Sequence, residues 1–279
     1  MTKMKWRFKR VLRKRYSRHI WIVAKRDGTQ GYFKTPVSPN KKAYRILVAN
    51  EYIAASLARS VGLPVAKTRV TIVKGPGVGK KRGIVSEKAK AKQIVTWKHA
   101  FGKMANRIEA HVDLVDLLSQ VIVFDAWILN WDRTDRNLIL YRNRPGETYK
   151  WYLIDHGLAL FGSPEKWKRR WARKPYKNSR SYEVALHPRK SRKSISQRVP
   201  AGFKRLVLKK RAQVDEMVRV IQQLPAHEIE RAIKKVPPGY LTKSERSFMK
   251  HMLLTRQKEL HRIVSRLLEK FQRKIENKK

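Results

Sequence analysis

The chain has 279 residues and a formal net charge of +46, from 67 Lys and Arg against 21 Asp and Glu. Its 42% hydrophobic content supports a sizeable core and argues against general disorder, and the lack of cysteine excludes disulfides and thiolate metal sites. No apolar run reaches the roughly 18 residues that a membrane span needs, and no apolar stretch follows the basic N-terminus as in a secretory signal. We therefore expect a cytoplasmic protein whose charge attracts anions, or one whose basic composition serves no dedicated partner.

The first 90 residues predict a basic arm followed by a small β-rich lobe. Residues 1–18 contain nine basic residues and no acid, which favours an arm or a solvated face. Asp27-Gly28 is typical of a hairpin turn, and Gly62 and Pro64 end a helix with apolar residues at helical spacing. The predicted elements of the N-lobe, residues 19–90, are strands over 19–24 and 31–34, a helix over 43–61, and strands over 68–73 and 82–86.

Residues 91–279 predict a second, mainly helical lobe. The segment from His99 to Asn130 is expected to be largely helical and buried on more than one side. Asn143-Arg144-Pro145-Gly146 is a turn signal between two apolar strands. A basic excursion over 166–211 has eighteen basic residues and one acid. The remaining predicted elements are the hairpin strands 138–141 and 151–154 and helices over 214–224, just after Pro225, and over 242–274.

Three polar residues around this hairpin have the spacing that phosphoryl transfer requires. Asp132 stands five positions before Asn137, and Asp155 ends an apolar strand eighteen positions after Asn137. In kinases one carboxylate orients the attacking hydroxyl, while an amide and a second carboxylate hold magnesium on the nucleotide phosphates. We predict Asp132 as the catalytic base and Asn137 and Asp155 as Mg²⁺ ligands. The alternative is that all three cap helices or turns.

The N-lobe offers residues for the other side of a nucleotide cleft. Lys34 lies on a predicted strand and Glu51 on the following helix, so the pair resembles the lysine and glutamate with which kinases position phosphates. Ser86, Glu87 and Lys88 fall where a hinge between lobes is expected, with backbone groups available to adenine, although an ordinary connector fits equally well.

Two further basic segments need an interpretation. The stretch 74–81 looks like a phosphate loop, but Gly75 and Gly79 enclose three residues instead of four and no Ser or Thr follows, so we expect a hairpin tip. The basic excursion contains aromatic residues, among them Trp167, Trp171 and Tyr176. It could therefore bind nucleic acid through phosphate contacts and stacking. The alternatives are a solvated loop or a clamp for an acidic substrate.

At this point the chain resembles the HipA-like kinases and, more distantly, the phosphatidylinositol 3- and 4-kinases. The matching pieces are Tyr32-Phe33-Lys34, Asn50-Glu51-Tyr52-Ile53-Ala54, Gly62-Leu63-Pro64-Val65, Phe124 to Arg133, Asn137, and Leu153-Ile154-Asp155-His156-Gly157. The resemblance implies an α+β, two-lobed kinase-like fold that binds ATP and Mg²⁺ between the lobes. It also implies transfer of the γ-phosphate to a hydroxyl, often of a protein serine. Two departures are the absence of a clear Gly-rich loop and the basic excursion.

The expected function is therefore an ATP- and Mg²⁺-dependent kinase acting on protein Ser or Thr. Two alternatives remain open. One is a nucleic-acid-binding protein that keeps a kinase-like fold with little catalysis, and the other is a lipid-headgroup kinase drawn to anionic membranes by its charge. Binding to nucleic acid or another polyanion through the basic surface is compatible with each of them.

Overall fold

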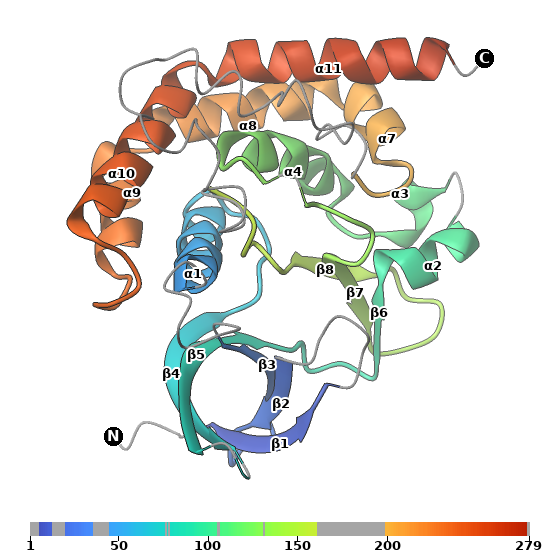
Figure 1. The fold of residues 1–279 in the computed structure, drawn as a ribbon. Coiled ribbons are helices and arrows are strands. Elements are labelled where there is room, and N and C mark those ends of the chain that lie inside the picture. The colour runs from blue at the N-terminus through green and yellow to red at the C-terminus, as the bar shows by residue number, and fades with distance from the viewer. Residues whose placement is uncertain are drawn as a thin grey trace.

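The computed structural model describes residues 6–12, 20–35, 45–75, 77, 79–104, 107–130, 132–160 and 199–277, without the side chains of 102–104. Within these residues a curled sheet and one helix stand beneath a larger helical layer (Figure 1). A small second sheet lies between them. No described helix combines the length and the apolar character that a membrane crossing demands.

The curled sheet has five antiparallel strands in the order β1-β2-β3-β5-β4. β1 and β4 contact each other, which gives the sheet its nearly closed shape in Figure 1. A buried cluster fills its interior, including Trp6, Trp21 and Phe33. The strands are β1 (Arg7–Val11), β2 (Ile20–Ala24), β3 (Gln30–Lys34), β4 (Thr68–Gly75) and β5 (Gly79–Glu87).

Within the segment expected to be a basic arm or a solvated face, residues 1–18, the described part contains strand β1. It pairs antiparallel with β2 at the edge of the sheet, where its charged side chains stay in water. The residues that anchor it are aromatic: Trp6 is buried, and the Phe8 ring meets the Trp21 ring edge-on at 5.2 Å between centroids. The basic composition of this segment therefore did not indicate a strand, which the side chains of Trp6 and Phe8 hold against the sheet.

The expected hairpins are present. Thr29 donates its N–H to the Asp27 carboxylate (2.9 Å), and Gly28 adopts a φ of 77° in the β2–β3 turn. The stretch 74–81 forms the tip of the β4–β5 hairpin, as predicted, with Gly75 paired to Gly79. The second sheet contains β6 (Gln93–Thr96), which the sequence did not suggest, beside β7 (Leu138–Arg142) and β8 (Lys150–Leu153).

Helix α1 (Arg45–Ser60) joins the curled sheet to the helical layer. Ten of its residues are buried, among them Asn50 and Glu51, because it packs against β4 and β5 on one side and against α9 on the other. Its first residue, Arg45, forms a salt bridge of 2.8 Å with Glu245 of α10. The helix is thus fixed at both the sheet and the helical layer, which positions Glu51 between them.

The helical layer is more divided than the sequence suggested. The segment expected to be largely helical over 99–130 contains three helices, and the helix expected over 242–274 breaks at Glu259. The excursion predicted over 166–211 ends earlier, in helix α7, and residues 161–198 lie outside the described part. The helices are α2 (Trp97–Met104), α3 (Ile108–His111), α4 (Val115–Trp127), α7 (Phe203–Lys209), α8 (Arg211–Gln223), α9 (Ala226–Lys234), α10 (Lys243–Lys258) and α11 (Leu260–Glu276).

Helix α4 is the centre of this layer. Every residue from Leu118 to Trp127 is buried, as the apolar pattern predicted. Its C-terminal carbonyl groups are satisfied by the buried Arg256 of α10, which donates to Trp127 O (2.8 Å) and Ala126 O (2.5 Å). Consequently the loop that follows α4 starts from a rigid, fully hydrogen-bonded helix end.

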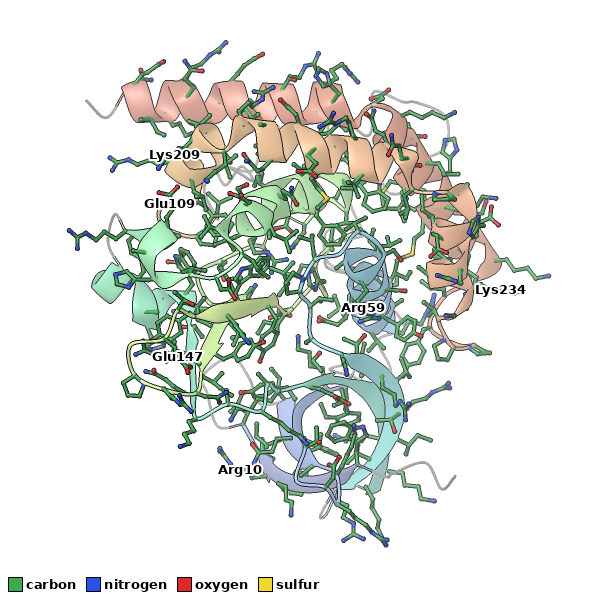
Figure 2. All side chains as sticks on the ribbon, turned by 180° about the vertical axis from the view of Figure 1, so that it is seen from behind. Arg10, Arg59, Glu109, Glu147, Lys209 and Lys234 are labelled. Atoms are coloured by element: carbon green, nitrogen blue, oxygen red, sulfur yellow. The ribbon has the colours of Figure 1, made fainter. Side chains whose placement is uncertain are left out.

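Figure 2 labels six charged residues from different elements of the molecule: Arg10, Arg59, Glu109, Glu147, Lys209 and Lys234. Lys209 of α7 and Glu109 of α3 lie together in that view, joined by a hydrogen-bonded salt bridge of 2.7 Å. Glu147 lies at the β7–β8 turn, where its carboxylate accepts hydrogen bonds from the N–H groups of Asn143 and Arg144. The predicted turn at this point is present.

Candidate active site

Lys34 stands where the curled sheet meets the rest of the molecule. It is the last residue of β3, and its Nζ lies 2.7 Å from Asp155 Oδ1 and 3.3 Å from Glu51 Oε2. The Lys34–Glu51 contact expected from the sequence is therefore present, and Asp155 joins it. Gly83 on β5 allows the strands to approach, because a Cβ there would lie 2.1 Å from Lys34 O.

The charges of this triad depend on one another. The pKa of Asp155 is lowered, first because the Lys34 ammonium is adjacent, although burial opposes the shift. The pKa of Glu51 is raised, first by burial, with only 2% of its side chain exposed, although Lys34 opposes that shift. Burial disfavours the Lys34 ammonium, but attraction to Asp155 and Glu51 outweighs it and raises the pKa of Lys34. Lys34 therefore stays charged at neutral pH.

Asp155 adopts a conformation that is uncommon for a residue with a Cβ. Its φ is 61°, in the left-handed region, directly after β8 ends at Leu153. The chain beyond it is fixed, because Asn50 of α1 donates from Nδ2 to Gly157 O at 2.8 Å. A strained backbone held by its surroundings is a frequent feature of functional sites, and here it directs the carboxylate to Lys34.

The loop after α4 holds Asp132 and Asn137 close together. Asn137 donates from Nδ2 to Asp132 O (2.6 Å), and the Thr134 N–H donates to the same carbonyl (2.8 Å). The Asp132 N–H in turn donates to Asn130 Oδ1 at 3.3 Å. Because the Asn137 amide nitrogen is occupied as a donor, its side-chain oxygen is the atom left to accept a hydrogen bond or a metal.

Arg133 holds this loop from within the core. Its side chain is 2% exposed and forms a two-point ion pair with Asp125 of α4, at 2.8 and 3.0 Å. Its Nη1 donates to Asn137 O (2.8 Å) and Ile154 O (3.2 Å). Asp135, which is nearer to Arg133 in sequence, accepts a hydrogen bond from the Ala201 N–H at 3.1 Å.

His156 connects Arg133 to Glu51. The imidazole is fully buried, and burial, Arg133 and Lys34 together hold its pKa well below the usual value of 6.5. Its Nε2 lies 2.9 Å from Arg133 Nη2. A guanidinium only donates, so Nε2 accepts and the proton belongs on Nδ1. That Nδ1 has no hydrogen-bond partner among the described residues and lies 3.9 Å from Glu51 Oε1.

A cavity of about 580 Å³ brings most of these groups to one space. Of the candidate site residues, Lys34, Asn137 and Asp155 line it together, whereas the half-buried Asp132 is not among its lining residues. Its other lining residues include the largely apolar Tyr32, Ile139, Tyr152 and Ile154, the polar Ser86 and Glu87, and the basic Lys98, His99 and Arg136. Sequence reasoning missed Lys98, His99 and Arg136: Arg136 lies within the motif without a distinguishing pattern, and Lys98 and His99 belong to helix α2, far from it in sequence.

The segment at residues 86–88 differs from the expected adenine-binding hinge. The Glu87 N–H donates to Lys67 O and the Lys88 N–H to Gln30 O, both at 2.9 Å. The Glu87 carboxylate pairs with Lys25 at 2.6 Å, and the Lys88 side chain does not line the cavity. Neither N–H group therefore points to an adenine, because pairing with neighbouring strands has consumed both donors.

The described residues contain no group of three or more His, Asp or Glu arranged to hold a metal. The oxygen donors facing the cavity from the predicted set are the Asn137 amide and the Asp155 carboxylate. Two such ligands suit Mg²⁺, which usually keeps several waters and takes its remaining ligands from substrate phosphates.

Comparisons with solved structures show the fold. A Helicobacter pylori proinflammatory kinase, CtkA, superimposes with a TM-score of 0.62 at 15% identity, over 96% of this chain and 97% of that one. HipA of Shewanella oneidensis MR-1, solved with HipB and operator DNA, gives 0.46 at 16% identity, over 86% and 60%. A golgi casein kinase gives 0.44 at 12% identity, over 95% and 75%. The superposition on CtkA shows the α+β, two-lobed kinase-like fold expected from the sequence.

Sequence comparisons identify the family. No curated protein matches the chain significantly. A family-wide sequence profile described as HipA-like kinase matches residues 18–171, which is more than half of the chain and includes Lys34, Glu51, Asp132, Asn137 and Asp155. The chain therefore belongs to the HipA-like kinase family.

Proposed function

We propose that this protein is an ATP- and Mg²⁺-dependent phosphotransferase that acts on serine or threonine hydroxyls of a protein. The observation that carries the proposal is the triad of Lys34, Glu51 and Asp155, which three distant segments form. Two of its members, Lys34 and Asp155, line the same cavity as Asn137. Desolvating a half-buried lysine and its carboxylate partners costs free energy, so such a group is weak evidence for a purely stabilising role. In kinases a lysine paired with a glutamate positions the nucleotide phosphates.

Each residue has a separate task in this proposal. Lys34 binds phosphate oxygens of ATP, and Glu51 keeps its ammonium in place. Asn137 and Asp155 would hold Mg²⁺, which neutralises charge on the phosphate oxygens when it is bound. Asp155 Oδ1 contacts Lys34 at 2.7 Å. When nucleotide and Mg²⁺ are bound, this contact would give way, with Lys34 on the phosphate oxygens and Asp155 on the metal. The apolar side of the cavity, formed by Ile139, Tyr152 and other residues, suits the adenine.

Asp132 completes the reaction. The acceptor oxygen attacks the γ-phosphorus, the bond from that phosphorus to the β–γ bridging oxygen breaks, and ADP leaves. Asp132 accepts the proton of the hydroxyl. The Asp132 N–H donates to Asn130 Oδ1 and the Asp132 carbonyl accepts from Asn137 Nδ2, and these two bonds fix the loop beside the cavity. The proposal also includes the boundary near residue 90 between the N-lobe, residues 19–90, and the helical lobe, residues 91–279.

The experiment is transfer from γ-labelled ATP to a mixture of basic and acidic protein acceptors, with Mg²⁺ or with excess EDTA. We expect label on serine or threonine only in the Mg²⁺ arm, with Lys34→Met reducing it at least about a hundredfold. Label in phospholipid vesicles and none in protein would favour the lipid-kinase alternative. A well-folded protein that binds nucleic acid but transfers label to neither acceptor would favour the nucleic-acid-binding alternative.

A further inference from the structure

A second cavity lies on the other side of the segment that connects the two sheets. Its volume is about 510 Å³, within the range of small-molecule sites. It shares only Glu87 and Tyr152 with the cavity that contains Lys34. Its walls come from the β2–β3 turn, the link between α1 and β4, residues 87–90, and strands β7 and β8. It is therefore separate from the proposed ATP cleft.

The charged groups around this second cavity are mostly lysines. Four lysines line it, against the carboxylates of Asp27 and Glu87. Glu87 is already paired with Lys25 at 2.6 Å. Asp27 accepts a hydrogen bond from the Thr29 N–H at 2.9 Å, and this bond is the first cause of its lowered pKa. Both carboxylates are therefore occupied within the protein.

Three lysines remain without a salt bridge to any residue that the structure describes: Lys67, Lys88 and Lys90. They come from two different segments, the α1–β4 link and the connector after β5, yet they border one cavity. The lining contains four lysines and two carboxylates, one of which is already paired with Lys25 and the other of which attracts Lys90, so the cavity keeps an excess of positive charge that a bound anion would offset.

The floor of the cavity carries no charge that would oppose an anion. Tyr141 and Tyr152 meet edge-on, with ring centroids 5.8 Å apart, and pack with Ala66 and Ala89. The Tyr152 hydroxyl accepts a hydrogen bond from the Ala89 N–H at 3.3 Å. Burial is the main cause that raises the pKa of Tyr152 to about 12, so this phenol stays neutral.

We propose that this cavity is a second anion site, which binds a multiply charged phosphate group through Lys67, Lys88 and Lys90. A nucleotide and free inorganic polyphosphate both present such a phosphate, with the same oxygens, to lysine. Lys88, expected from the sequence to serve the adenine, would belong to this site. The proposal does not depend on catalysis, since it concerns residues outside the cleft that contains Asp155.

The test measures binding of tripolyphosphate and, separately, of ADP to the full chain by titration calorimetry. At about 0.15 M salt the screening length is about 8 Å, so distant charges contribute little. The test variant replaces Lys67, Lys88 and Lys90 with Ala. The matched control replaces Lys9, Lys74 and Lys80, all exposed on the curled sheet, and removes the same charge.

We expect the test variant to bind tripolyphosphate at least about tenfold more weakly, and the control variant to change less than about twofold. A second, weaker ADP site lost only in the test variant would identify a nucleotide as the source, and loss confined to tripolyphosphate would identify free polyphosphate. Equal losses in both variants, or no loss in either, would overturn the proposal. Because no turnover is measured, an inactive kinase would leave this result interpretable. If the triple variant does not fold, Lys67→Ala and Lys90→Ala at these exposed positions serve the same comparison.

Discussion

Removing the Arg133 side chain should destabilise the protein severely. All five of its N–H donors are engaged: two with the Asp125 carboxylate, two with the carbonyls of Asn137 and Ile154, and one with His156. Arg133 and Asp125 are 2% and 1% exposed, so Arg133→Met leaves a buried carboxylate without its counter-charge. Breaking such a pair costs about 3–5 kcal/mol. That is a large part of the roughly 5–15 kcal/mol by which domains are stable.

Urea unfolding of four proteins tests this reasoning: wild type, Arg133→Met, Asp125→Leu and the double variant. Each single change should lower the free energy of unfolding by about 3–5 kcal/mol. The double variant should lose at least about 2 kcal/mol less than the sum, because neither charge is then left alone in the core. A cost below about 1 kcal/mol for Arg133→Met, or strict additivity, would refute the account of Arg133 as the residue that holds the catalytic loop.

Three further predictions concern the triad and its surroundings. Gly83→Ala places a methyl group against Lys34 O, so it should lower the free energy of unfolding by about 1–3 kcal/mol and weaken ATP binding. The control is Gly157→Ala, because its Cβ would come no closer than 3.6 Å to any neighbour. Equal losses of stability in the two variants would contradict the close approach of β5 to Lys34. Glu51→Gln should raise the KM for ATP about tenfold by loosening Lys34, and an unchanged KM in steady-state assays would exclude that role. Since the folded pKa of His156 is lowered, the unfolded chain binds the proton first, so stability should fall by about 1.4 kcal/mol per pH unit below about pH 6.5. Urea midpoints between pH 7.5 and 5.5 should show a shallower fall in His156→Gln, and an identical slope would contradict the assignment.

The candidate site residues could be predicted because the chemistry proposed for them restricts them to few arrangements. A lysine ending a strand, a glutamate on the next helix and an aspartate after a hairpin strand are marked by element type and by the spacing of the motif. Lys34 and Glu51 do meet, and Asp155 joins them. What spacing cannot express is the left-handed backbone of Asp155, since that conformation depends on how the surrounding segments fix the chain.

The partner of Arg133 was not predictable from nearness in sequence. Asp135 is two positions away and Asp125 eight, yet the ion pair forms with Asp125. The chain reverses after α4, where Leu129 takes a φ of 55°, and this turn brings the guanidinium back against the helix. Burial then decides the pairing, because a charge inside the core must meet a counter-charge that is also buried.

Element boundaries failed where apolar periodicity continued through a break. The pattern of α10 and α11 is uninterrupted across Glu259, so the sequence suggested one helix, but two helices pack on different parts of the core. The predicted helical segment over 99–130 divides at Leu114, which takes a φ of 51° while Asp113 pairs through its N–H with Tyr149 O. Contacts with a distant part of the chain produce that break, and the spacing of apolar residues along the sequence does not reveal such contacts.

Phosphoryl transfer by Asp155→Ala and Asp132→Ala tests the central claim most directly. The measurement is the rate of label transfer from γ-labelled ATP to protein, with Asp27→Ala as a control that removes an exposed carboxylate outside the cleft. We expect each cleft variant to lose about 10²–10⁴-fold in rate and the control to keep the wild-type rate. Transfer that continues unchanged in both cleft variants would contradict the account.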